Sequence, residues 1–163
     1  MDTAYDSTKD TFEHIARVRY LLRVVEANLV RRQYAHDLSK LEEPEKSVFD
    51  EMTPKLKRST YGSDEYKSFL ARMKPALDHH YANNSHHPEH YPNGVSGMSL
   101  LDLIEMLCDW KAAGERHADG SMTKSLQVNQ ERFGIGSQLQ QILENTALEM
   151  GWLPAPVGGG TAV

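Results

Sequence analysis

The histidines of this chain are concentrated where they could hold a metal ion. Of the eight histidines, five lie between His79 and His90, and His36 is followed directly by an acid, Asp37. Neutral imidazole and carboxylate groups bind zinc, iron, manganese and similar ions without thiolates. The single cysteine cannot form an internal disulfide or a thiolate cluster, so a metal site here would use histidine and carboxylate ligands.

Two acids further along the chain could complete such a site. Glu105 and Asp109 are one helical turn apart at the edge of an apolar stripe, where an acid is costly unless something positive meets it. A single histidine of this kind is commonly a solvated or hydrogen-bonded side chain. The clustering of several histidines with acids favours a metal site over that simpler interpretation.

The apolar periodicity predicts the helices that would position these groups. In residues 8–34 apolar side chains recur at steps of three and four, which is typical of an amphipathic helix, and His14 falls near the middle of the stripe and is predicted to face inward. Further helices are predicted at 42–58, 64–80, 99–116, 122–133 and 137–150. Pro75 should kink or split the third of these six, and the histidine-rich residues 83–94 form a loop.

The overall pattern is that of an all-α protein. No alternating strand pattern and no internal repeat is present. We therefore expect a single helical domain of about six or seven helices over residues 1–153. Residues 154–163, rich in glycine, are predicted to form a flexible C-terminal tail.

Composition excludes several classes of partner. The formal net charge is -5 and there is no dense basic run, which argues against binding a nucleic-acid polymer. No stretch approaches the about 18 apolar residues of a membrane span. The N-terminal segment lacks the basic start and apolar run of a secretory signal, so a cytoplasmic location is expected.

The order of the candidate residues resembles a known family. His14, then His36-Asp37 one helix later, then a histidine-rich stretch and finally Asp109 resemble the ordered H, HD, D signature of the HD-domain metal-dependent phosphohydrolases. His36-Asp37-Leu38-Ser39-Lys40 looks like the HD-x-x-K form, in which the lysine lies near the substrate phosphate. Together with residues 79–89 and 108–111, the chain from about 9 to 115 is similar to an uncharacterised bacterial and phage domain family within that group.

This resemblance implies an HD-like helical bundle with one or two divalent metal ions, of manganese, iron, cobalt, zinc or magnesium. The first ion would be held by His14, His36, Asp37 and Asp109. Asp37 would bridge to a second ion, for which His80 and His87 are the chosen ligands and His79 and His86 the alternates.

The same resemblance implies hydrolysis of a small phosphorylated substrate, with a nucleotide as the leading candidate. Besides Asp37, the expected catalytic residues are Lys40, which would neutralise a phosphate oxygen, and Glu105, which could orient a ligand or accept a proton. Arg17 and Lys111 are further candidates for binding phosphate, although a plain surface charge explains each equally well.

Two other functions stay open from the sequence. The surplus of histidines could hold two irons, as in HD-type oxygenases, which use dioxygen to cleave carbon bonds. The chain could also be a non-catalytic module that binds a metal or another ligand. Self-association into a homo-oligomer is compatible with either.

Overall fold

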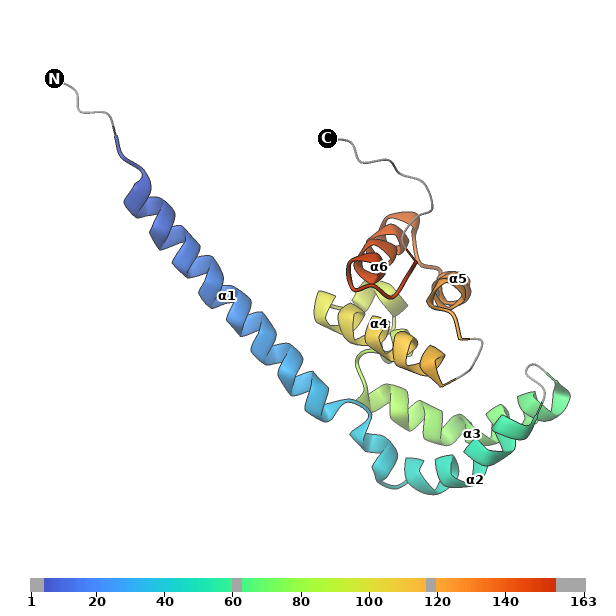
Figure 1. Cartoon of the computed structure of the whole chain (residues 1–163). Coiled ribbons are helices and arrows are strands. Elements are labelled where there is room, and N and C mark those ends of the chain that lie inside the picture. The colour runs from blue at the N-terminus through green and yellow to red at the C-terminus, as the bar shows by residue number, and fades with distance from the viewer. Residues whose placement is uncertain (1–4, 60–62, 117–119, 155–163) are drawn as a thin grey trace. The chain divides into compact units, whose positions relative to one another are not determined.

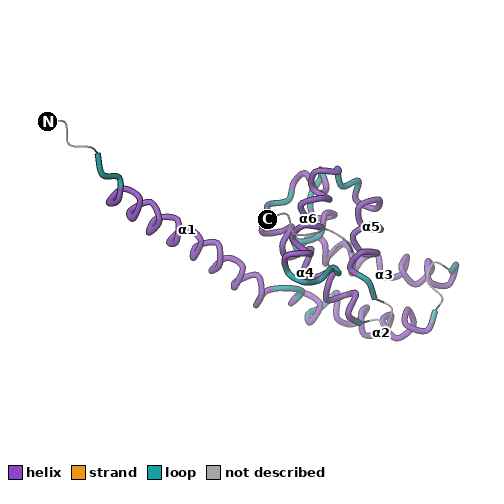
Figure 2. The backbone as a smooth tube through the Cα atoms, turned by 45° about the horizontal axis from the view of Figure 1, so that its top comes forward, coloured by secondary structure: helices purple, strands orange, loops and turns teal. Residues whose placement is uncertain are grey.

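The computed structural model describes residues 5–59, 63–116 and 120–154, and these are helical with connecting loops (Figure 2). The described residues form six α-helices and three short 3-10 turns and contain no strand, which confirms the all-α prediction. The chain divides into two units, Met1–Leu38 and Ser39–Val163, where one domain over residues 1–153 was predicted. Residues 155–163 of the predicted tail lie outside the described residues.

The first unit is dominated by one long helix. α1 (Thr8–Ala35) has 28 residues, as the three- and four-residue spacing predicts (Figure 1, blue). It ends at His36, whose N–H donates to the Arg32 carbonyl at 2.8 Å, and Asp37 then takes a left-handed backbone conformation with φ 58°. Aspartate tolerates this conformation better than most non-glycine residues.

The prediction that His14 faces inward is wrong. No residue of α1 is buried, and His14 is exposed. The apolar periodicity shows that this helix has an apolar face, but it does not say which surface covers that face.

The second unit begins with a pair of helices that lie side by side (Figure 1). α2 (Glu45–Arg58) and α3 (Asp64–Asn83) bury Met52, Met73 and Ala76. Pro75 does not split α3, which runs without interruption past it. Proline removes one backbone donor, and we attribute the tolerance of this loss to the packing of α3 against α2.

A histidine-rich connection links this pair to α4. It contains two 3-10 turns, Pro88–His90 and Gly94–Gly97, in the segment predicted as a loop. α4 (Leu100–Glu115) starts at a capping box, in which Ser99 and Asp102 each hydrogen-bond the backbone N–H of the other. Its buried apolar residues are Leu103, Met106 and Leu107, whereas Ile104 on the same helix is 40% exposed.

The core of the second unit lies between α4 and the two helices that follow. α5 (Met122–Phe133) and α6 (Ser137–Glu149) match their predicted ranges to within one residue. α5 ends at Gly134, whose φ of 60° is left-handed. The core residues are Leu103, Met106, Leu107, Met122, Leu126, Ile135, Leu143 and Ala147. Within the described ranges, no helix has both the length and the apolar character needed to cross a bilayer.

Candidate metal centre

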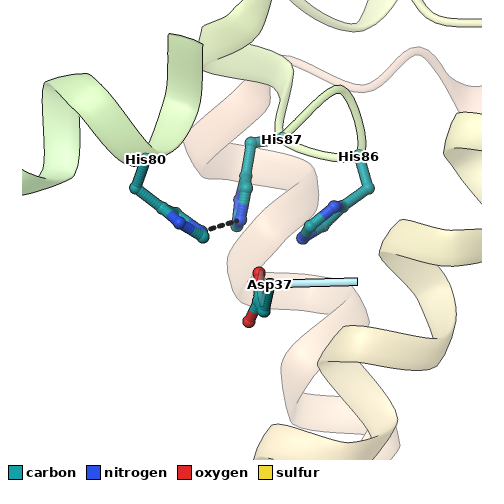
Figure 3. Close-up of side chains that lie close together, drawn as sticks. All are labelled: Asp37, His80, His86 and His87. Carbon is teal, nitrogen blue, oxygen red and sulfur yellow. Dashed lines mark hydrogen bonds between the residues drawn. The ribbon is translucent and has the colours of Figure 1, made fainter. Parts of the chain in front are cut away.

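Three histidines of the second unit converge on one point. His80 comes from the end of α3, and His86 and His87 come from the connection that follows it (Figure 3). One ring nitrogen of each lies within 4.8 Å of one ring nitrogen of both others. His80 and His86 are both only 1% exposed. Such a group of imidazoles is a donor set suited to a transition-metal ion.

One pair of these histidines has a separation compatible with two ligands on one ion. His80 Nε2 and His87 Nε2 are 2.9 Å apart (Figure 3, dashed line). A zinc–nitrogen bond is about 2.0–2.1 Å long, so two nitrogens on one ion lie about 2.9 Å apart at a right angle and about 3.3 Å apart at the tetrahedral angle. At the same distance one ring can donate an N–H to the other. The separation of 2.9 Å therefore fits either a hydrogen bond between the rings or two ligands on one ion.

A buried carboxylate orients His80. Glu45, the first residue of α2, is fully buried and places Oε2 at 2.9 Å from His80 Nδ1. An ionised carboxylate can only accept, so Nδ1 of His80 carries the proton and Nε2 presents its lone pair toward His87. The other oxygen of Glu45 accepts from His79 Nδ1 at 2.7 Å. His79 is therefore turned toward Glu45.

A chain of hydrogen bonds keeps this carboxylate ionised. Asn84 Nδ2 donates to Ser39 Oγ at 2.8 Å, and Ser39 Oγ donates to Glu45 Oε2 at 3.1 Å. Burial raises the pKa of the Glu45 carboxyl, but the hydrogen bonds that it accepts from His79, Ser39 and His80 act in the opposite direction and outweigh burial. The net result is a Glu45 pKa below its usual value, so this carboxylate is ionised near neutral pH and can only accept hydrogen bonds.

His86 has the same kind of partner on another helix. Its Nδ1 lies 3.2 Å from Glu105 Oε1, and the Glu105 side chain is 13% exposed. Glu105, a predicted catalytic residue, is thus placed to orient His86, as Glu45 orients His80. Two of the three imidazoles have a carboxylate at Nδ1, an arrangement common behind histidines that bind metal through Nε2.

The connection that carries His86 and His87 is tied to the start of α4. Asp102 is 2% exposed. Its Oδ1 accepts from Ser85 Oγ at 2.7 Å, and its Oδ2 accepts from Tyr91 OH at 2.9 Å. The same carboxylate closes the capping box with Ser99. One buried acid therefore fixes both ends of the histidine segment to the helix that supplies Glu105.

The remaining predicted residues of the second unit lie near these elements. Asp109 is half-buried on α4, one turn after Glu105. Lys40 is half-buried in the 3-10 turn Leu38–Leu41, with Nζ 5.5 Å from the centre of the Phe49 ring. Lys111 Nζ forms an ion pair with Glu115 at 2.9 Å, which fits its interpretation as a surface charge.

In the first unit, His14 cannot meet His36 within one chain. Both lie on or just after the continuous helix α1, and 22 residues at 1.5 Å each separate them by about 33 Å. Arg17 is separated from His36 by about 28 Å in the same way, and its guanidinium lies 5.0 Å from the centre of the Tyr20 ring. The predicted first site of His14, His36, Asp37 and Asp109 is therefore wrong for a single chain. His36 and Asp37 remain together, with His36 Nε2 3.6 Å from Asp37 Oδ2.

Sequence reasoning missed the residues that support the histidines. Glu45 lies in the first turn of α2, where an acid is common, and its burial depends on contacts with α3 that no local pattern encodes. Asp102 had a detectable signal, because Ser99-Leu100-Leu101-Asp102 has the spacing of a capping box.

Comparison with known proteins gives a family and no activity. Residues 3–149 match the model of a family described as a family of unknown function (DUF5662). No curated protein and no solved structure matches the chain.

Proposed function

We propose that this chain, which belongs to the DUF5662 family, is a metal-dependent hydrolase of small phosphorylated molecules. The observation that carries the proposal is the convergence of His80, His86 and His87 with Glu45 and Glu105 behind them. A surface cluster of histidines would not need a buried and a half-buried carboxylate to set the direction of its rings.

Asp37 is proposed as the carboxylate ligand of the same centre. It precedes Ser39 by two residues, and two residues span at most about 7 Å. Ser39 Oγ lies 3.3 Å from His80 Nδ1, so chain connectivity alone keeps Asp37 near the centre whatever the direction of α1. Three imidazoles and one carboxylate would hold one ion of zinc, iron, manganese or cobalt and leave room for water or substrate.

The chain's own residues would divide the remaining work of hydrolysis. A bound divalent ion supplies a water of lowered pKa and a Lewis acid for the phosphoryl group. Lys40 directly follows Ser39, which touches His80, so its ammonium group is within reach of a phosphate oxygen and would neutralise its charge. Glu105 is proposed to hold His86 in place and to take up a proton during turnover. A nucleotide is the leading substrate candidate, because its phosphate suits both the ion and Lys40.

Metal analysis followed by a turnover assay tests this proposal. The purified protein should contain, or take up, a stoichiometric divalent ion, and it should release phosphate from at least one member of a nucleotide panel with manganese, cobalt, zinc or magnesium. Asp37→Asn is the sharpest variant, because asparagine also tolerates the left-handed backbone of residue 37. We expect it to lose activity while its circular dichroism spectrum stays that of the unsubstituted chain.

Other outcomes would replace the proposal. Two irons per chain with consumption of dioxygen would indicate an oxygenase. A bound ion without turnover of any phosphorylated substrate would indicate a non-catalytic metal-binding module. Absence of a bound ion after incubation with each metal would contradict the centre itself.

A further inference from the structure

The long helix α1 has an apolar face that no other helix of its own unit covers. None of its 28 residues is buried. Val18, Leu22 and Val25 are 39%, 63% and 44% exposed, far more than core residues of the second unit such as Leu126 at 2%. A helix of this length in water gains most of its stability from packing such a face against another surface.

The spacing of the apolar residues is that of a two-stranded coiled coil. Ile15, Val18, Leu22, Val25 and Leu29 follow one another at steps of three, four, three and four. Two and a half heptads of this kind place Ile15, Leu22 and Leu29 at position a, and Val18 and Val25 at position d. Such a seam is the contact surface of a second helix with the same pattern.

We propose that α1 pairs with α1 of a second copy of this chain in an antiparallel coiled coil. Antiparallel packing places each a residue in a layer with a d residue of the other helix. The register that gives four apolar layers around the centre of the seam sets Leu22 against Val25 and Val18 against Leu29, each pair occurring twice by two-fold symmetry. This pairing needs nothing from the second unit and does not depend on the metal centre.

Charge complementarity favours this partner and this direction. Arg19 and Glu26 both take position e beside the seam. In this antiparallel register, Arg19 of each helix lies beside Glu26 of the other, which gives two ion pairs. In a parallel dimer, position e faces position g, which holds His14, Leu21 and Asn28, so neither ion pair forms.

The register also gives His14 a defined neighbourhood. His14 takes position g and lies opposite Ala35 of the other helix, one residue before His36 of that copy. The dimer thus brings together, across two chains, residues that one chain holds about 33 Å apart along α1.

Sedimentation analysis of the full chain tests the dimer. Val25→Glu places a charge in the seam and should raise the dimer dissociation constant by at least about 100-fold. Val24→Glu is the matched control, since Val24 is 43% exposed against 44% for Val25 but takes position c outside the seam, and it should leave the dimer intact. At a chain concentration of about 100 µM, a dimer with a dissociation constant at or below that value would be detected. A monomer at this concentration overturns the proposal. Equal effects of the two substitutions also overturn it.

A charge exchange and a cysteine cross-link test the direction. Arg19→Glu and Glu26→Arg should each weaken the dimer about 3- to 10-fold, and the double variant should restore it. In a Cys108→Ser background, Ile15→Cys should not form a disulfide between copies, because in the antiparallel register the two residues 15 are separated by about 26 Å along the seam. Efficient cross-linking through residue 15 would overturn the antiparallel arrangement.

Discussion

At the scale of single residues, the proposed centre depends on His87, which joins His80 across 2.9 Å. Loss of a group that only orients a metal ligand lowers metal affinity by up to about 100-fold. Because His87 is proposed as a ligand itself, His87→Ala should lower the affinity by more than that. His90→Ala is the matched control, because His90 lies in the same connection and is also half-buried, but its Nδ1 donates to the Tyr81 carbonyl at 2.8 Å. Titration with zinc or cobalt, followed by calorimetry, measures both. Equal losses would show that the segment, and not the His87 ring, binds the ion.

Glu45 acts through the ring of His80 and is a positioning residue. Glu45→Gln keeps the size of the side chain but replaces one of its two acceptor oxygens with an NH2 group, which can only donate. That NH2 group would face either His79 or His80. If the amide faces His80, the proton moves from Nδ1 to Nε2 and blocks the metal-binding lone pair. We expect a loss of metal affinity of about 10- to 100-fold.

The nitrogen chemical shifts of the histidine rings distinguish this role from a merely structural one. They should report a protonated Nδ1 for His80 in the unsubstituted protein and a change of tautomer in the Glu45→Gln variant. Glu42→Gln, a substitution of an exposed acid in the preceding turn, should change neither the shifts nor the affinity. An unchanged His80 tautomer in Glu45→Gln would contradict the assignment of Glu45.

At the scale of elements, the turn Gly94–Gly97 controls the segment that carries the histidines. A Cβ added at Gly97 would lie 2.7 Å from Tyr91 Cβ, closer than such atoms can approach, and Tyr91 in turn donates to Asp102. Gly97→Ala should therefore destabilise the protein by about 1–3 kcal/mol. Gly114→Ala, on α4 with open space at its Cβ, should stabilise the protein or leave it unchanged. Urea denaturation measures both, and equal stability of the two variants would contradict the steric argument.

The elements also show how far sequence reasoning reaches. The range of α5 was predicted correctly, because its apolar periodicity ends at a left-handed glycine, Gly134, and such signals are local. The face that a helix buries is not local: α4 exposes Ile104 in place of burying it, and α1 exposes its whole stripe. The concentration of histidines between residues 79 and 90 is likewise a local feature that the sequence shows. The grouping of His86 with His80 and His87, and the burial of Glu45, depend on the packing of α2, α3 and α4.

At the scale of the whole molecule, metal binding and folding are coupled. The three histidine ligands come from the end of α3 and the connection after it, so they are held together only in the folded chain. An ion that binds the folded state at 100 times its dissociation constant stabilises that state by about 2.7 kcal/mol. For a chain of this size, such a gain should raise the melting temperature by about 5–10 °C.

Differential scanning calorimetry of the metal-free protein, with and without zinc or manganese, checks this coupling. Addition of a chelator should reverse the rise, and His87→Ala should abolish it while melting near the temperature of the metal-free parent. If the His87→Ala variant shows the same rise, His87 does not bind the ion. The ion would then bind elsewhere in the chain, which would contradict the proposed centre. A rise confined to the unsubstituted protein would tie the stability of the second unit to the geometry of its three converging imidazoles.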